Sequence, residues 1–160
     1  MTSEHQAMEA NKRIVYRFID ECWNKGDLSS VHELVAANCR FHDPVFPHLP
    51  AGAENVRHHI EGCRRGFPDL KYTVDDTVAE HNEVVLHWTA FGTHKGTFLG
   101  IPPTNNKSYV TGTSIFRIEG QKIVEQWSNW NLMSLMEQLG VEATPKQMAG
   151  MPHHEAKVIL

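Results

Sequence analysis

The stretch KSYVTGTSIFRIEGQKIVEQWSNWN, residues 107–131, contains two runs rich in β-branched and aromatic residues, joined by the polar segment EGQ. Partly alternating apolar and polar positions predict strands, and the short segment between them predicts a tight turn. Two earlier runs, LKYTVDDTVAEH (70–81) and EVVLHWTAFGTH (83–94), have the same character. The second half of the chain is therefore predicted to form a mainly antiparallel sheet.

The first half of the chain has helical periodicity instead. Apolar residues recur at helical spacing from about Met8 to Trp23, and further helices are predicted over Leu28–Ala37 and Ala53–Arg65. Between them, CRFHDP (39–44) predicts a short strand that ends at a proline, and LMSLMEQLG (132–140) predicts a last helix. Helices followed by antiparallel strands indicate an α+β fold, in which helices cover one face of a curved sheet. A curved sheet closed by helices forms a cone, and the open end of this cone is a natural small-molecule pocket.

The composition indicates one domain with small-molecule partners. A chain of 160 residues with 41% hydrophobic and 21% charged residues suits one globular domain, predicted over residues 1–141, with residues 142–160 as a peripheral tail. The net charge of −4 and the scattered Lys and Arg residues favour neither nucleic-acid nor membrane binding. The charged N-terminus does not resemble a signal peptide, which predicts a cytoplasmic protein. Three widely spaced cysteines indicate neither a disulfide framework nor a zinc ribbon.

Several short motifs follow one another in residues 92–140, GTHKGTFLGIPPTNNKSYVTGTSIFRIEGQKIVEQWSNWNLMSLMEQLG. They are a GTHxG turn, a GIPPT loop, an FRI strand, a KIVExW strand and a terminal QLG. Upstream, FIDECWNKGDLSSVHELVAANCRFHDP (18–44) provides two helices and a first strand. Taken together over about residues 8–141, these features resemble the SnoaL-like polyketide cyclase family of the NTF2-like superfamily.

This resemblance implies a conical α+β barrel with a deep hydrophobic pocket, a homodimer or homotetramer, and no metal or organic cofactor. Characterised cyclases of the family close a ring by intramolecular aldol condensation on a polyketide ester, with an aspartate as general acid and base. That aspartate lies four residues after the tryptophan of the KIVExW strand, and the matching position here is Asn131. Because an amide cannot cycle a proton near neutral pH, Asn131 is predicted to orient or polarise a carbonyl rather than to act as the base.

The strand at residues 123–131 carries polar groups and a tryptophan on each face. If Trp127, Asn129 and Asn131 face the cavity, the indole supplies an apolar wall and the amides supply hydrogen bonds to a carbonyl-bearing ligand. The alternative is that Trp127 belongs to the core and that the asparagines cap the strand and start the last helix. The sequence predicts the first arrangement and leaves the second open.

Two further residues are predicted as proton carriers. Asp43 lies where the first strand enters the cone, where apolar neighbours would raise the pKa of its carboxyl; alternatively, it forms an Asx-turn before Pro44. His94 lies in the GTHxG turn and titrates near neutrality when unperturbed, although turn histidines are more often structural. His42 is adjacent to Asp43, so at most one of these two side chains is expected to line the cavity.

The predicted site therefore has two groups of residues. The predicted catalytic residues are Asn131, Asp43 and His94, and the predicted substrate-binding residues are Trp127, Asn129, His42, Phe18 and Trp88. No metal site is predicted, because the histidines show no known ligand spacing. The expected activity is proton transfer on a small apolar carbonyl compound, either ring closure or isomerisation. The alternative is a ligand-binding protein of the same fold that has lost the base.

Overall fold

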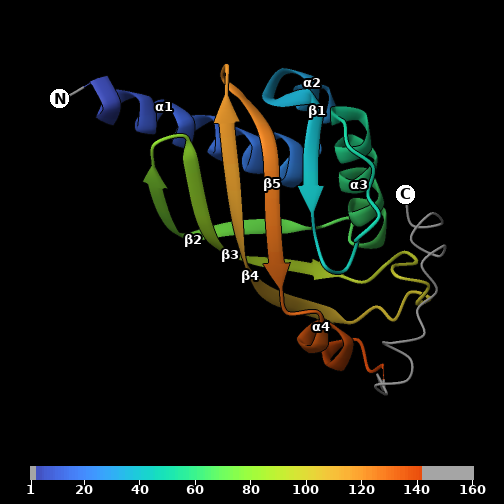
Figure 1. Ribbon diagram of the computed structural model, residues 1–160. Helices are drawn as coiled ribbons and strands as arrows, with labels where there is room; N and C mark the ends of the chain where they lie inside the picture. Colours follow the sequence, from blue (N-terminus) through green and yellow to red (C-terminus); the bar gives the residue numbers. More distant parts are fainter. Residues whose placement is uncertain (1–2, 142–160) are drawn as a thin grey trace.

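The computed structural model describes residues 3–141, in which helices pack against a curved five-stranded sheet (Figure 1). The helices are α1 (Ser3–Arg17), η1 (Phe18–Asn24), η2 (Leu28–Ser30), α2 (Val31–Leu34), α3 (Ala53–Gly66) and α4 (Leu132–Gln138). The strands are β1 (Val35–His42), β2 (Lys71–Glu80), β3 (Glu83–Thr93), β4 (Lys107–Glu119) and β5 (Lys122–Trp130). This architecture confirms the predicted α+β class. The predicted tail, residues 142–160, lies outside the described residues.

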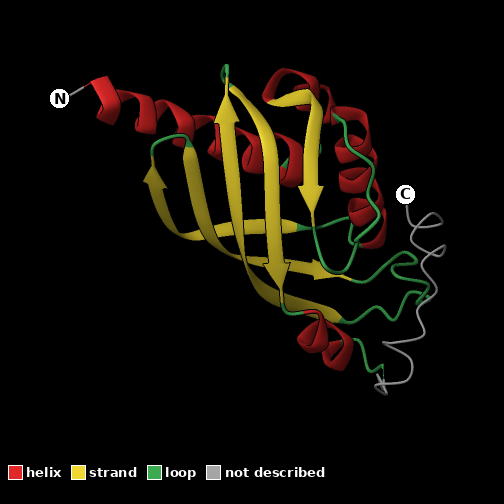
Figure 2. Ribbon diagram, viewed as in Figure 1, coloured by secondary structure: helices red, strands yellow, loops and turns green. Residues whose placement is uncertain are grey.

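The sheet is mixed and open. Its strand order is β1-β5-β4-β3-β2, with β1 parallel to β5 and every other neighbouring pair antiparallel. Helices α1 and α3 lie on the same side of this strongly curved sheet, and α4 lies beyond the end of β5 (Figure 2). None of the helices within residues 3–141 combines the length and the apolar character needed to cross a membrane.

The helix predicted over Leu28–Ala37 is shorter than expected. Residues 28–34 are helical, but Val35 has extended dihedral angles (φ −116°, ψ 132°) and pairs with Ile123 of β5. A β-branched residue that can join a buried parallel ladder favours the strand over another helical turn. The first strand is therefore β1, eight residues long, and it delivers Asp43 to the far end of the sheet.

The tight turn predicted at EGQ (119–121) is confirmed by its backbone angles, and a second tight turn joins β2 and β3. His81 has a φ of 50° between β2 and β3, and Gly120 and Gln121 have φ values of 54° and 62° between β4 and β5. Consecutive residues with positive φ are typical of the hairpin turns that match the twist of antiparallel strands. Residues 95–106, which contain the GIPPT motif, form a loop between β3 and β4 that we call the rim loop, and in it Phe98 and Ile101 pair through their backbones.

The sheet has an inner face toward the helices and an outer face away from them. On β3 the residues Val84, Leu86, Trp88 and Ala90 are buried on the inner face, whereas the alternating Phe91 is 49% exposed. Gly112 of β4 lets two inner tryptophans approach, because a Cβ there would lie 2.3 Å from the Trp88 ring and 2.8 Å from Cβ of Trp130. The strands therefore place large aromatic rings close together over one end of the sheet.

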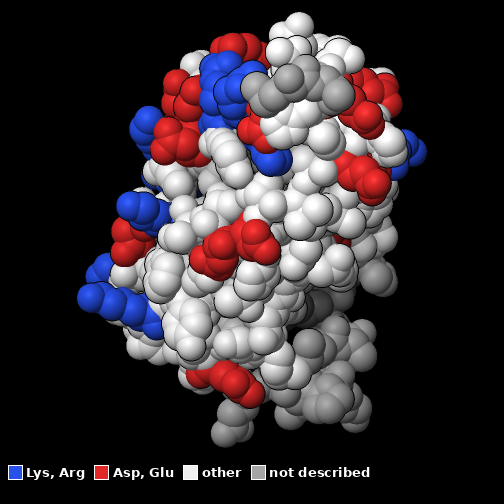
Figure 3. All heavy atoms as spheres, turned by 90° about the vertical axis from the view of Figure 1, so that its left-hand side faces the viewer, with Lys and Arg blue, Asp and Glu red and all other residues white. Residues whose placement is uncertain are grey.

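Charged side chains are mixed on the side of the molecule that lies at the left of Figure 1. Figure 3 shows Lys and Arg side chains spread among Asp and Glu side chains on this face, with a broad area of uncharged residues between them. This face therefore offers no continuous surface of a single charge.

Candidate active site

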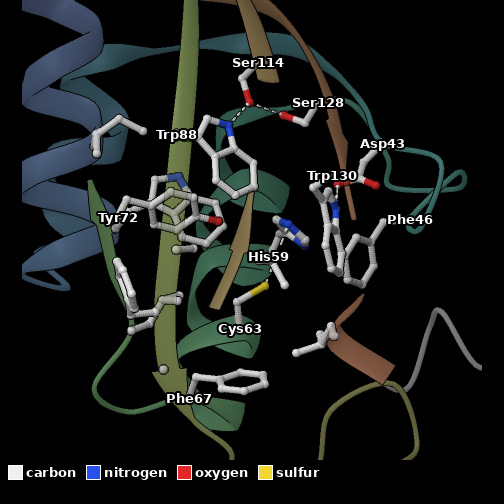
Figure 4. Close-up of a pocket in the computed structure, with 18 of the residues that line it drawn as sticks. Asp43, Phe46, His59, Cys63, Phe67, Tyr72, Trp88, Ser114, Ser128 and Trp130 are labelled. Carbon is white, nitrogen blue, oxygen red and sulfur yellow. Dashed lines mark hydrogen bonds between the residues drawn. The ribbon is translucent and has the colours of Figure 1, made fainter. Parts of the chain in front are cut away.

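A pocket lies between α3, the inner face of the sheet and the rim loop (Figure 4). It encloses about 780 Å³ of empty space, the open solvent at its mouth included. Its wall is largely aromatic and aliphatic, formed among others by Trp23, Phe46, Phe67, Tyr72, Trp88, Phe98, Phe116 and Trp130. A few polar side chains interrupt this apolar wall: Asp43, His59, Ser108, Ser114, Gln126 and Ser128.

Strand β5 contributes Gln126, Ser128 and Trp130 to the pocket. These residues lie on the face of the strand opposite to the one predicted. The expectation that Trp127, Asn129 and Asn131 face the cavity is therefore wrong. Each face of this strand carries a tryptophan and polar residues, so its hydrophobic pattern does not decide between them. The deciding contacts come from other strands: the Ser128 hydroxyl lies 2.8 Å from the Ser114 hydroxyl, and the indole of Trp130 reaches Asp43.

Trp127 and His42 lie together on the outer face instead. Their rings stack at a centroid distance of 5.3 Å, and the guanidinium carbon of Arg117 is 4.9 Å from the Trp127 ring. Nε2 of His42 is 2.8 Å from Oε1 of Glu125, whose other oxygen accepts from Arg40 and Arg117 at 2.8 Å. Burial alone would raise the pKa of Glu125, but these three partners lower it. Asn129 is exposed on the same side of the sheet.

Asn131 is the N-cap of α4. Its side-chain oxygen accepts a hydrogen bond of 3.0 Å from the backbone N–H of Ser134, and its backbone N–H donates to Thr111. This is the capping arrangement that the sequence left open as an alternative. The amide is thus engaged in starting the helix, outside the pocket.

Replacement of the cap is expected to affect stability and not catalysis. Asn131→Ala should lower the free energy of unfolding by about 0.5 to 2 kcal/mol, because an N–H at the start of α4 loses its acceptor. Denaturant unfolding followed by far-UV circular dichroism measures this change. Asn131→Asp should be nearly as stable as wild type, because aspartate is an equally good cap. Titration of that aspartate as a buried group would contradict the position of residue 131 described above.

Asp43 lines the pocket and also forms the predicted Asx-turn. Its Oδ1 accepts from the backbone N–H of Val45 at 2.8 Å, and its Oδ2 accepts from Nε1 of Trp130 at 2.9 Å. The residue is 6% exposed. Burial raises the pKa of this carboxyl, and the two hydrogen bonds offset part of the increase. The geometry therefore gives a fixed carboxylate with a raised pKa beside an apolar cavity, which is how proteins prepare a carboxylate as a base.

His59 is a pocket residue that the sequence analysis did not single out. It projects from α3 into the middle of the view in Figure 4, and its ring centroid is 4.6 Å from that of Phe46. Burial lowers the pKa of its imidazole to about 4, so the ring is neutral at pH 7. Its Nε2 is 3.9 Å from the thiol sulfur of Cys63, whose pKa burial raises to about 12. The helical spacing of Val56, His59, Ile60 and Cys63 is the signal that could have placed His59 on the inner side of α3.

The remaining predicted residues are divided between the pocket wall and the layer behind it. Trp88 lines the pocket and donates from Nε1 to Oγ of Ser114 at 2.9 Å. Phe18 lies one layer behind, with its ring edge on Phe116 at a centroid distance of 6.1 Å. His94 is fully buried below the pocket, stacked on Phe67 at 5.2 Å, and its Nδ1 accepts from the backbone N–H of Thr104. Burial lowers the pKa of His94.

Clusters of metal-ligating side chains are absent from the part of the chain that the structure describes: no three His, Cys, Asp or Glu residues of 3–141 come together closely enough to hold an ion. The pocket instead combines one carboxylate, one neutral imidazole, the Tyr72 phenol and several hydroxyl and amide groups. Burial raises the pKa of Tyr72 well above 10, so this phenol stays protonated. These groups suit proton transfer and hydrogen bonding to an uncharged ligand.

The fold has counterparts among solved structures. TsrD from Streptomyces laurentii is 27% identical, with a TM-score of 0.75 and coverage of 82% of this chain and 96% of TsrD. IdmH from Streptomyces antibioticus, provisionally described as a polyketide cyclase, is 29% identical, with a TM-score of 0.72 and coverage of 82% and 99%. AclR from Streptomyces galilaeus, provisionally described as a hydroxylase, is 26% identical, with a TM-score of 0.73 and coverage of 83% and 97%. The helices and the open, curved sheet therefore form an α+β fold of the NTF2-like cone type.

A comparison with curated protein sequences gave no match. The sequence profile of the family described as "SnoaL-like polyketide cyclase", in contrast, matches residues 13–139. This match spans α3, all five strands and the whole of α4, and therefore every element that builds the pocket. The chain belongs to the SnoaL-like polyketide cyclase family.

Proposed function

We propose that this protein is an enzyme that moves a proton on a small apolar carbonyl compound, with Asp43 as the general base. The observation that carries the proposal is the position of this carboxylate: it is 6% exposed, it is held by Val45 and Trp130, and it borders an otherwise aromatic pocket. Each carboxylate oxygen has two lone pairs, and each accepts one hydrogen bond from the protein. Acceptor capacity therefore remains for a proton of the ligand.

The proposed step begins with a C–H bond next to the ligand's carbonyl. The Asp43 carboxylate takes this proton, and the bonding electrons move to the carbonyl oxygen, which gives an enolate. The enolate carbon then attacks a second carbonyl of the same molecule, which closes a ring, and the resulting alkoxide takes the proton back from Asp43. Alternatively, in a ligand whose C=C bond is conjugated with the enolate, Asp43 returns the proton to the far carbon of that system, which isomerises the compound. The apolar wall supports the step because it excludes water, which strengthens electrostatic interactions inside the pocket.

A neutral donor near the reacting oxygen would complete this arrangement. His59 is uncharged at pH 7 and has one N–H, and the Tyr72 phenol stays protonated. Both line the same cavity as Asp43. Donors that carry no charge stabilise a developing oxyanion without taking the proton from Asp43.

The competing proposal is a ligand-binding protein without catalysis. Its support is Asn131, the amide at the position that corresponds to the family's aspartate, which caps α4. Two relatives are provisionally described as enzymes, one as a cyclase and the other as a hydroxylase, and they therefore leave the type of reaction open. The raised pKa of the pocket carboxylate favours the enzyme, since a base is of no use in a site that only binds.

The test uses 2-tetralone, an apolar bicyclic ketone with acidic C–H groups beside its carbonyl. A base in the pocket should exchange these protons for deuterium in D₂O, and proton NMR measures the loss of signal. Exchange should rise as pH increases through the pKa of Asp43, which lies above the free value of about 3.9. Exchange no faster than with an equal concentration of an inert protein would favour the binding protein.

Self-association through the outer face of the sheet is a second part of the proposal. Phe91 and Tyr109 are 49% and 58% exposed there, and their ring centroids are 6.1 Å apart. Neighbouring exposed aromatic side chains on a sheet face are typical of an interface. Wild-type protein should sediment as a dimer or larger, and Phe91→Lys combined with Tyr109→Lys should sediment as a monomer. A wild-type monomer at micromolar concentration would contradict this prediction.

A further inference from the structure

A chain of hydrogen-bonded polar side chains lies at one end of the pocket, opposite Phe67 (Figure 4). Nε1 of Trp88 donates to Oγ of Ser114 at 2.9 Å, and the hydroxyls of Ser114 and Ser128 are 2.8 Å apart. Nε2 of Gln126 donates to Oγ of Ser128 at 2.9 Å. All four side chains line the pocket, and each is between 3% and 5% exposed. This polar chain is the longest run of polar groups in an otherwise aromatic wall.

The polar chain contains more hydrogens than it uses. An indole has one polar hydrogen, each serine hydroxyl has one, and a glutamine amide has two, which gives five in all. Three of them form the bonds within the polar chain. No other acceptor among residues 3–141 lies within hydrogen-bond distance of these side-chain donors, so two hydrogens remain without a partner.

The surplus does not depend on how the hydrogens are arranged. The hydroxyl pair can be oriented in either direction, but in each case one serine hydrogen joins the two oxygens. If the Gln126 amide is turned so that its oxygen accepts from Ser128, both amide hydrogens become free instead. Two donors are left over in every arrangement, and the cavity is the space that these side chains border.

A buried donor without an acceptor is costly, so these donors are expected to meet an acceptor in the bound state. We propose that Ser114, Ser128 and Gln126 form a subsite for an oxygen acceptor of the ligand, such as a ketone or ester carbonyl. This inference deepens the proposed function and rests on it in one respect: the proposed function is what places a first carbonyl of the ligand beside Asp43. The ligand class is then an apolar compound with at least two oxygen functions, one for each polar part of the pocket.

The test compares two flat apolar probes that differ at one atom, 9-fluorenone with a carbonyl and fluorene with a methylene. Quenching of the fluorescence of the pocket tryptophans Trp23, Trp88 and Trp130 gives the Kd of each probe. In Gln126→Leu/Ser128→Ala the bond from Trp88 to Ser114 is kept and only the Ser114 hydrogen remains without a partner, so the ratio of fluorenone to fluorene affinity should fall roughly three- to tenfold, as expected for the loss of one hydrogen bond. The ratio cancels the difference in hydrophobicity between the probes.

Ser108→Ala is the matched control, because Ser108 also lines the pocket and its hydroxyl donates to a backbone carbonyl of Gly92 at 3.5 Å. Its fluorenone to fluorene ratio should equal that of wild type. An unchanged ratio in the double variant, or an equal fall in Ser108→Ala, would overturn the subsite.

A measurement on wild-type protein covers the case in which the double variant does not fold, since Gln126 and Ser128 are both buried. Intermolecular NOEs should connect the fluorenone protons that flank the carbonyl, H1 and H8, with the β protons of Ser114 and Ser128. NOEs from the opposite edge of the ring would overturn the inference. Neither binding nor NOE measurements depend on turnover. If the wild type does not exchange 2-tetralone but the affinity ratio falls as expected in the double variant, the proposed enzyme is wrong and the subsite stands. If 2-tetralone is exchanged but the ratio does not fall, only the subsite is wrong.

Discussion

Asp43→Asn should slow protein-catalysed exchange of the 2-tetralone protons by about 100- to 10,000-fold, the usual contribution of a general base. The amide has nearly the shape of the carboxylate, and its oxygen still accepts from Val45 or from Trp130. It cannot take up a proton, however, so the chemical step should fail while the pocket keeps its form. Proton NMR in D₂O measures the exchange, and tryptophan quenching measures the Kd of 2-tetralone, which should change less than about threefold because the apolar wall dominates binding.

Two variants make the result specific to Asp43. Asn131→Ala alters the position that corresponds to the family's aspartate, and it should exchange 2-tetralone at the wild-type rate because this residue caps α4 outside the pocket. His94→Gln removes the other predicted proton carrier, which does not line the cavity, and should also retain exchange if it folds. Wild-type exchange in Asp43→Asn together with loss of exchange in either of the other variants would place the base elsewhere.

The order of elements could be predicted from the sequence because each element has its own local signal. Alternating apolar residues, glycine turns and helical periodicity gave the α+β class and the hairpin of β4 and β5. The end of the second helix could not be predicted in this way. Val35 follows a helical pattern without a break, and only its pairing with Ile123 on a strand almost ninety residues later makes it extended.

The candidate site was predicted in part. Two of the predicted site residues, Asp43 and Trp88, line the pocket. Which face of β5 lines the pocket depends on the hydrogen bond between the Ser114 and Ser128 hydroxyls and on the one from the Trp130 indole to Asp43. Both are contacts with segments far away in the sequence. A strand with a tryptophan on each face gives no local reason to choose between them. Small polar residues face inward here because the large Trp88 ring fills the space above Gly112.

His59→Leu should remove a large part of the acid sensitivity of the fold. Burial lowers the pKa of His59 to about 4 in the folded protein, whereas the unfolded chain has a value near 6.5. Below about pH 6.5 the unfolded state therefore binds a proton that the folded state does not. The stabilising effect of the neutral ring is complete above that pH and is lost as pH falls toward 4, by about 3 kcal/mol in total.

Other buried groups also titrate in this range, so the comparison between variants is the informative quantity. Burial lowers the pKa of His94, which adds to the loss in acid, while the raised pKa of Asp43 acts in the opposite direction. Free energies of unfolding at pH 7 and pH 4 should differ less in His59→Leu than in wild type, by about 2 to 3 kcal/mol. Urea unfolding followed by tryptophan fluorescence measures both values.

His58→Leu is the matched control, because His58 is the neighbouring residue on α3 but its side chain is 43% exposed and pairs with Glu54 at 3.1 Å. Solvent screens such a pair, so this variant should keep almost the whole wild-type difference between pH 7 and pH 4. A histidine NMR titration of the folded protein gives a direct check on His59. An imidazole that titrates near 6.5 would show that water reaches the ring freely, and it would contradict the burial of His59 on which this prediction rests.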